Sequence, residues 1–157
     1  MSFSYYEIYI NALRAFSGMG FPYGADEDAA FIIAWLELNK LNGIKLLANS
    51  INNIDQKYDG KINLNKSDFK IDLKYSSVLM KGPGLIDYLV SKLNKKKGIK
   101  IIVNNCSEEK FFFPLLYKNS DILPYASLNY INCNNENIIC IFKKGTMQIF
   151  LDSKKNK

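Results

Sequence analysis

Apolar residues recur every three or four positions through the first third of the chain, which is the period of an amphipathic helix. A first helix is predicted over residues 4–16, because Ser4 and Glu7 form a capping-box pattern at its start. A second helix follows, with acidic residues in the first turn, and a short third one is predicted near residues 44–51. The apolar faces comprise Tyr6, Tyr9, Ile10, Leu13 and Phe16 in the first helix, and Ala29, Ile32, Ile33, Trp35, Leu36 and Leu41 in the second.

Glycines lie at the expected turns of this helical region. Gly18 and Gly20 fit the C-terminal cap of the first helix, where a left-handed backbone favours a residue without Cβ. Gly24 lies in the turn that leads into the second helix, and Gly43 is expected to end that helix. Residues 1–51 are therefore predicted to form an antiparallel helix pair followed by a short helical segment.

The hydrophobic period changes to two after residue 52. Apolar and charged residues alternate over 68–75, which indicates a half-solvated strand. A further helix is predicted at about 85–95, since its apolar residues have helical spacing and it ends in lysines. Residues 98–103 then have the composition of a buried strand.

The C-terminal part predicts a β-hairpin. Residues 137–143 and 146–152 are strand-like, and Lys144 with Gly145 forms the connecting turn, where Gly145 supplies a positive φ. Residues 106–132 stay ambiguous between strand and helix.

Helices first and mainly strands later predict an α+β fold, with an N-terminal helical hairpin packed on a mixed or antiparallel sheet, one further helix and the C-terminal hairpin. A chain of 157 residues suits a single domain over residues 1–157, helical to residue 51 and mainly strands from residue 52 on.

The composition excludes several kinds of chemistry. The chain has no histidine, so imidazole general bases and Ser–His or Cys–His nucleophile pairs are excluded. Cys106, Cys133 and Cys140 are an odd number at spacings that fit neither a disulfide framework nor a C-x-x-C metal site, so we expect reduced thiols, no metal and no cofactor. No apolar run is long enough to span a membrane and the N-terminus does not read as a secretory signal, which predicts a cytoplasmic protein.

The formal net charge of +6 comes almost entirely from lysine, with Arg14 as the single arginine. Base recognition depends on bidentate arginine and stacked aromatic side chains, and neither is patterned here. A coding bias toward Lys, Asn and Ile explains the charge equally well. Nucleic acid is therefore not the expected partner.

One candidate site for a ligand lies before the predicted helix at 85–95. Lys81, Gly82 and Gly84 are expected in a turn whose free backbone N–H groups, backed by the lysine, would attract a carboxylate or phosphate. Ser77, just upstream, could donate a further hydrogen bond, and Asp87 would lie in the first turn of the helix. The alternative is an ordinary loop-to-helix turn in which Asp87 only complements the helix dipole.

Two further features have alternative interpretations. Glu27 is the other candidate acid or base beside Asp87, but Asp26, Glu27 and Asp28 point about 100° apart around a helix, which favours first-turn capping. The run Phe111-Phe112-Phe113 would expose at least one ring on a strand. That ring predicts an apolar interface near residues 111–117, with a second copy of the chain or a partner protein.

The spacing of the glycines and acidic residues resembles the sequence pattern of a known protein family. Gly18-x-Gly20-x-x-x-Gly24-x-x-Glu27-x-Ala29, followed by Trp35-Leu36, and later Gly82-Pro83-x-Leu85-x-Asp87, resembles a family of small bacterial proteins known as a domain of unknown function. Asp26 departs from the glutamate more usual in that family. The resemblance implies a shared fold and carries no activity.

A weaker similarity is to the helical N-terminal region of the malate and lactate dehydrogenases that lack a Rossmann fold. Those enzymes have Ser-His-Gly where this chain has Ile44-Lys45-Leu46, so the dehydrogenase chemistry does not carry over.

The sequence therefore leaves three hypotheses of function. The first is a non-catalytic interaction or accessory protein that forms a homo-oligomer or binds a partner protein. The alternative is a binder of, or an enzyme acting on, a small anionic metabolite at residues 81–84, and the third is a nucleic-acid-binding module.

Overall fold

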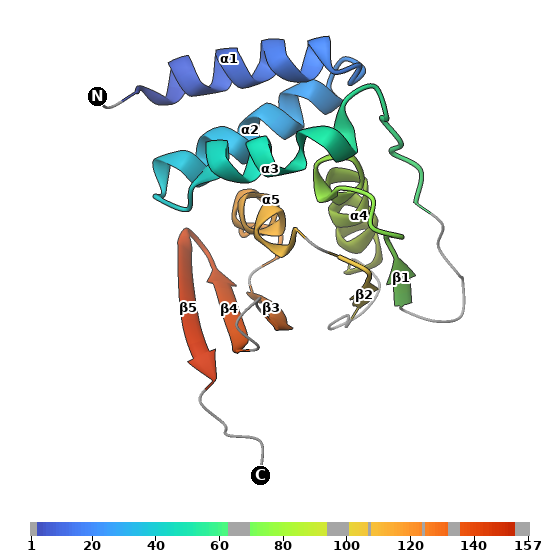
Figure 1. Cartoon of the computed structure of the whole chain (residues 1–157). Coiled ribbons are helices and arrows are strands. Elements are labelled where there is room, and N and C mark those ends of the chain that lie inside the picture. The colour runs from blue at the N-terminus through green and yellow to red at the C-terminus, as the bar shows by residue number, and fades with distance from the viewer. Residues whose placement is uncertain are drawn as a thin grey trace. The chain divides into compact units, whose positions relative to one another are not determined.

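A computed structural model describes residues 3–62, 70–93, 101–106, 108–123, 125–131 and 136–152 (Figure 1). Within these residues the chain forms five α-helices, one short 3-10 helix and five strands, which confirms the α+β class. The chain divides into two compact units, residues 1–115 and 116–157, and each is described by itself.

The first unit begins with three helices: α1 (Tyr5–Gly18), α2 (Ala25–Leu38) and α3 (Gly43–Ile54). The predicted capping box is present, since the Glu7 N–H donates to Ser4 Oγ at 3.2 Å and the Ser4 N–H donates to Glu7 Oε2 at 2.8 Å. α1 and α3 both pack against α2, whose residues 32–36 are all buried, so this part of the helix is enclosed on every side. The predicted helix pair and the short third helix are therefore confirmed.

Gly43 has a different role from the predicted one. It does not end α2, which stops at Leu38, but begins α3. A Cβ at Gly43 would collide with the carbonyl of Ile33 and lie 2.9 Å from the Glu37 nitrogen. The glycine therefore allows the start of α3 to approach the backbone of α2.

The rest of the first unit contains α4 (Val78–Leu93) and a parallel pair of short strands, β1 (Lys70–Asp72) and β2 (Ile102–Asn104). Ile71 and Leu73 are buried, as the alternating pattern predicts, but the ladder is shorter than expected. The strand predicted over 98–103 is present from Ile102, where β2 begins, but the prediction that it is buried is wrong, because Ile102 is 43% exposed. Residues 98–100 lie outside the described part.

A 3-10 helix, η1 (Glu109–Phe111), leads into α5 (Phe112–Lys118), so the ambiguous segment around Pro114 is helical. Pro114 is in the first turn of α5, where a missing N–H breaks no helical bond. Phe111, Phe112 and Phe113 are 1%, 4% and 1% exposed. The expectation of an exposed aromatic surface is wrong. Consecutive helical residues point about 100° apart, and all three rings are buried here because the segment is covered on more than one side: η1 packs against both α2 and α4.

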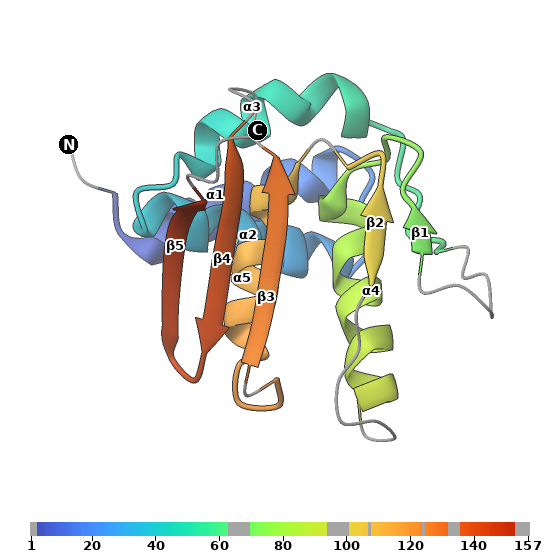
Figure 2. The ribbon, with the colours of Figure 1, turned by 90° about the horizontal axis from the view of Figure 1, so that it is seen from below.

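The second unit is an antiparallel sheet of β3 (Tyr125–Ile131), β4 (Asn137–Lys143) and β5 (Thr146–Asp152), in that order (Figure 2). β4 and β5 form the predicted hairpin: Lys143 pairs with Thr146, and Gly145 has φ +67°. Strand β3 lies in the segment that the sequence left ambiguous.

Candidate functional site

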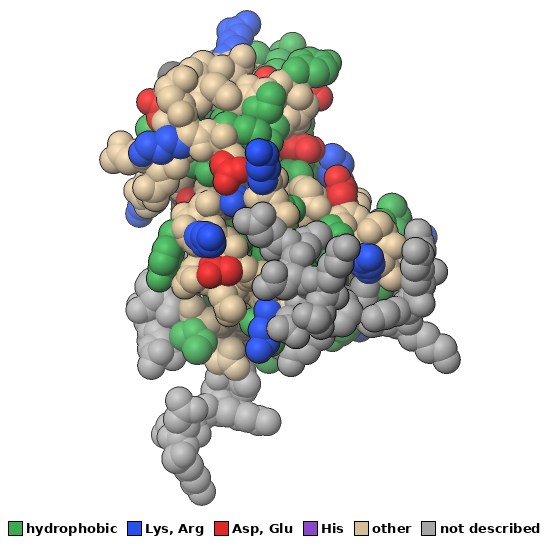
Figure 3. Space-filling model, turned by 90° about the vertical axis from the view of Figure 1, so that its right-hand side faces the viewer, with side chains coloured by type: hydrophobic (Ala, Val, Ile, Leu, Met, Phe, Trp, Pro, Cys, Tyr) green, Lys and Arg blue, Asp and Glu red, His purple; other side chains and the backbone are tan. Residues whose placement is uncertain are grey.

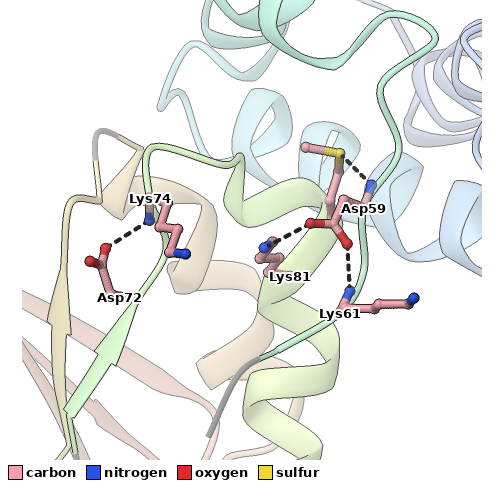
Figure 4. Close-up of polar contacts among 6 residues, drawn as sticks. Asp59, Lys61, Asp72, Lys74 and Lys81 are labelled. Atoms are coloured by element: carbon pink, nitrogen blue, oxygen red, sulfur yellow. Dashed lines mark hydrogen bonds and ion pairs between the residues drawn. The ribbon is translucent and has the colours of Figure 1, made fainter.

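Lys81 is the candidate anion-binding lysine, and it lies in the second turn of α4 with only 10% of its side chain exposed. Its Nζ is 3.1 Å from Oδ2 of Asp59, a carboxylate that is 53% exposed (Figure 4). Asp59 Oδ1 also accepts a hydrogen bond of 3.1 Å from the Lys61 N–H. This bond, followed by that from Lys81, lowers the pKa of Asp59 below its usual value. The lysine is therefore paired with a carboxylate of its own chain.

The turn predicted at residues 81–84 is absent. α4 begins at Val78 instead of residue 85, so Gly82, Pro83 and Gly84 are helical. A Cβ on Gly82 would lie 2.7 Å from Val78 Cγ1 and 2.9 Å from Leu115 Cδ1. Gly82 therefore permits close packing inside the first unit, and the predicted free N–H groups do not exist at this position.

The true N-terminus of α4 already binds an anion, the side chain of Glu108. Ser77 is 2% exposed, and its Oγ accepts a hydrogen bond of 3.2 Å from the Leu79 N–H. Glu108 Oε2 accepts from the Ser77 hydroxyl and from the Val78 N–H, the latter at 3.1 Å. The physical reason given for an anion site was sound, because a helix N-terminus attracts carboxylates. The sequence contains no signal that would have identified Glu108, which is 31 residues from Ser77.

The two candidate acids do not approach a common centre with Lys81. Asp87 is exposed and lies in the middle of α4, not in its first turn. It follows Lys81 by six residues on the helix, which places the two side chains about 120° apart around the axis and roughly 9 Å apart along it. Glu27 is partly exposed in the first turn of α2, as the capping interpretation predicts.

Asp26 is the buried member of the acidic triplet, at 7% exposure. Its Oδ1 accepts hydrogen bonds from the Gly24 N–H at 3.0 Å and the Glu27 N–H at 2.9 Å. These bonds close the turn before α2 and supply the negative charge that the helix dipole favours. Burial raises the pKa of Tyr9, and the negative charges of this acidic triplet raise it further. Among the three acids, Glu27 has the largest effect.

A second polar group surrounds Asp72 and is separate from the Asp59 group (Figure 4). Asp72 Oδ1 accepts hydrogen bonds of 2.8 Å from the Lys74 N–H and from Asn105 Nδ2. The bond from Lys74 and then that from Asn105 lower the pKa of Asp72. These contacts join the ends of β1 and β2 and account for the carboxylate structurally.

Thiol and metal chemistry have no support in the described residues. Burial raises the pKa of the Cys106 thiol to about 11, which disfavours the reactive thiolate. Cys140 is buried, and Cys133 lies outside the described part. Among the described side chains no three His, Cys, Asp or Glu residues converge as metal ligands.

The distribution of charge can be followed on one face of the molecule. On the face drawn in Figure 3, acidic and basic side chains lie next to one another. The part of this face that the structure describes therefore carries mixed charge and not a continuous basic stripe of the kind typical of nucleic-acid-binding proteins.

A groove of about 260 Å³ lies on the first unit, where α1 and α3 pack on α2. Its floor includes the buried Ala12 and Ile33, and its rim includes the exposed Phe3 and Ile44. The sequence missed this groove, because its residues looked like parts of separate helical faces. The lining consists of Phe3, Glu7, Ile8, Asn11, Ala12, Ala15, Ile33, Ile44 and Leu47.

Residues 3–73 match the model of a family described as "Protein of unknown function (DUF3726)". The expected resemblance to a domain of unknown function is thereby confirmed for the part of the chain that contains α1, α2 and α3. The second stretch of the resemblance, from Gly82 to Asp87, lies beyond the matched residues. No curated protein and no solved structure matches the chain. None of the described helices has the length and apolar character needed to cross a membrane.

Proposed function

We propose that this protein is a non-catalytic, cytoplasmic interaction protein, and that the groove formed by α1, α2 and α3 binds an amphipathic helix of a partner protein. The observation that carries the proposal is the groove itself, whose lining is mostly apolar and includes partly exposed side chains such as Ile44 and Leu47. A surface of this kind loses unfavourable contact with water when apolar side chains of a partner enter it.

The walls of the groove favour a helix over an extended peptide. They are helices, whose backbone N–H and C=O groups are bonded internally except at the ends, so an added strand would find no edge to pair with. A partner helix satisfies its own backbone and presents apolar side chains at positions i, i+3 or i+4, and i+7. The volume of about 260 Å³ is below the range of about 300–1,000 Å³ that is usual for a small-molecule site.

Charge specifies the partner further. Glu7 is the charged residue in the groove lining. Hydrogen bonds from the Ser4 N–H and then the Ser4 hydroxyl lower the pKa of its carboxyl group, so it is ionised at neutral pH. We therefore expect a partner helix with a lysine or arginine beside its apolar face, at the end that meets Glu7.

The test is selection from a displayed library of amphipathic helices in which the polar positions are randomised. Selected peptides, labelled with fluorescein, should bind the wild-type protein saturably in fluorescence anisotropy and should be enriched in Lys or Arg. Ile44→Glu should weaken their binding at least tenfold, whereas Leu38→Glu, a change at a 55% exposed residue outside the groove lining, should leave it unchanged. A library that yields no saturable binder, or binders indifferent to Ile44→Glu, refutes the proposal.

Binding of a small anionic metabolite at Lys81 is the second candidate. One observation favours it: the ammonium group is largely buried, while its partner Asp59 is 53% exposed and could be displaced by another carboxylate. Thermal-shift measurements with carboxylates and phosphorylated metabolites test it, and a stabilisation that Lys81→Met abolishes would support it. No shift, or an equal shift in Lys81→Met, removes it. Ser77, Gly82 and Gly84, the other residues of the predicted site, would contact such a ligand only if the first turns of α4 rearranged.

A further inference from the structure

We propose that strand β5 pairs in antiparallel fashion with β5 of a second copy of this chain, so that two three-stranded sheets join into one continuous sheet. The inference concerns the second unit alone and is independent of the groove on the first unit. It also differs from the interface first expected near residues 111–117, whose aromatic rings are buried.

The first observation is the free edge of the sheet. β5 is the last strand in the order β3-β4-β5, and among the described residues it pairs with β4 alone. Its pairing with β4 runs without a bulge from Thr146 opposite Lys143 to Asp152 opposite Asn137. A long regular edge strand presents a row of unpaired N–H and C=O groups, and the chemical group that satisfies such a row is another strand.

The second observation is the apolar character of this edge. Ile149, Phe150 and Leu151 are consecutive and are 47%, 46% and 67% exposed. Successive strand residues point to opposite faces, so both faces of the sheet are apolar at this edge. Proteins usually protect an exposed edge with lysine, proline or a bulge. Residues 146–151 contain no charged residue and no proline, so β5 has the features of a strand that is paired in use.

Self-complementarity identifies the occupant as a second copy. Two antiparallel copies of one strand are related by a two-fold axis, which is the commonest symmetry of homo-oligomers. In the register with Gln148 opposite its own copy, Met147 lies opposite Ile149 of the second copy. The same register places Thr146 opposite Phe150 of the second copy, so uncharged residues face each other throughout the segment 146–150 and no like charges meet.

The mass of the full chain in solution tests the proposal. Light scattering after size exclusion should give twice the 18.0 kDa of one chain at micromolar concentration. Ile149→Lys should return the mass to 18.0 kDa, because it places like charges at a paired edge. Ile131→Lys is the matched control, since Ile131 is a 68% exposed isoleucine on the other edge strand, and it should leave the dimer intact. A wild-type monomer, or a dimer broken by Ile131→Lys and not by Ile149→Lys, overturns the proposal.

Oxidative cross-linking gives a second measurement that does not depend on weakening the edge. Residues directly opposite each other in an antiparallel pair have Cα atoms about 4.5–5.5 Å apart, within the range of a disulfide. Gln148→Cys should therefore form a 148–148 cross-link, identified by mass spectrometry of the joined peptides, and Ser127→Cys on β3 should not. A 127–127 cross-link without a 148–148 cross-link would assign the interface to the wrong edge. Binding of helical peptides to Ile149→Lys should equal that of the wild type, so failure here is distinguishable from failure of the groove.

Discussion

Gly82 and Gly84 lie two residues apart in the same helix, yet substitution by alanine should change stability in opposite directions. Alanine is the better helix former by about 1 kcal/mol, so each change gains up to that amount if nothing else alters. At Gly84 the nearest atom to a new Cβ is Ile62 Cδ1 at 3.2 Å, the end of a flexible side chain that can move aside. Gly84→Ala should therefore raise the free energy of unfolding by about 0.5 kcal/mol.

At Gly82 the new methyl group has no free space. It would lie 2.7 Å from Val78 Cγ1 and 2.9 Å from Leu115 Cδ1, and both side chains are themselves buried. Overpacking of this kind costs about 1–3 kcal/mol. The residue before a proline is also disfavoured in helical conformation once it carries a Cβ, which adds to the cost at Gly82. The net loss of unfolding free energy should be about 1–2 kcal/mol after the gain in helix propensity is subtracted.

Urea unfolding followed by the fluorescence of Trp35 measures both changes, because this single tryptophan lies in α2, within the first unit. The midpoint should fall for Gly82→Ala and rise slightly for Gly84→Ala with the same slope m. Equal stabilisation by both substitutions would refute the packing role assigned to Gly82.

The remaining predictions concern the polar contacts and the thiol. Ser77→Ala should lower the free energy of unfolding by about 1 kcal/mol, because it removes the cap of α4. Ser91→Ala, a change at an exposed residue of the same helix, serves as the control in thermal unfolding. Equal effects of the two substitutions would contradict the capping role. Because the folded pKa of Asp59 is lowered, its contribution to stability is present above the unfolded pKa of about 3.9 and is lost as pH falls through the folded value. Asp59→Asn should therefore be less stable than wild type at pH 7 and equal to it near pH 2, and a difference that persists in acid would count against this assignment. Cys106, with a pKa of about 11, should react with iodoacetamide at pH 8 about 100-fold more slowly than a model thiol. The rate is measured by mass spectrometry of the peptide that contains Cys106. A rate equal to that of the model thiol would show that this thiol is not buried.

Much of the secondary structure could be predicted where the pattern is local. The Ser4–Glu7 capping box, the acids at the start of α2 and the Lys144-Gly145 turn each depend on residues within a few positions of one another. The start of α4 could not be predicted, because Gly-Pro-Gly normally ends or precedes a helix. In this chain Gly82 is instead required by the side chains of Val78 and Leu115, the latter far away in sequence.

The candidate site was predicted for a correct physical reason at an incorrect position. A helix N-terminus does attract an anion here, but the helix begins at Val78 and the anion is Glu108. Neither fact has a local signature. The groove was missed for a similar reason, since Ala12, Ile33 and Ile44 belong to three helices whose packing the periodicity of each helix does not specify.

The contact between Glu108 and the start of α4 has a consequence for this helix. The Glu108 carboxylate accepts hydrogen bonds from the Ser77 hydroxyl and the Val78 N–H, so these donors at the start of α4 are already satisfied within the chain. Truncation of Glu108 to alanine would remove the acceptor of the Ser77 hydroxyl and of the Val78 N–H, two donors that belong to almost fully buried residues. The start of α4 therefore depends on a carboxylate that the chain supplies 31 residues beyond Ser77.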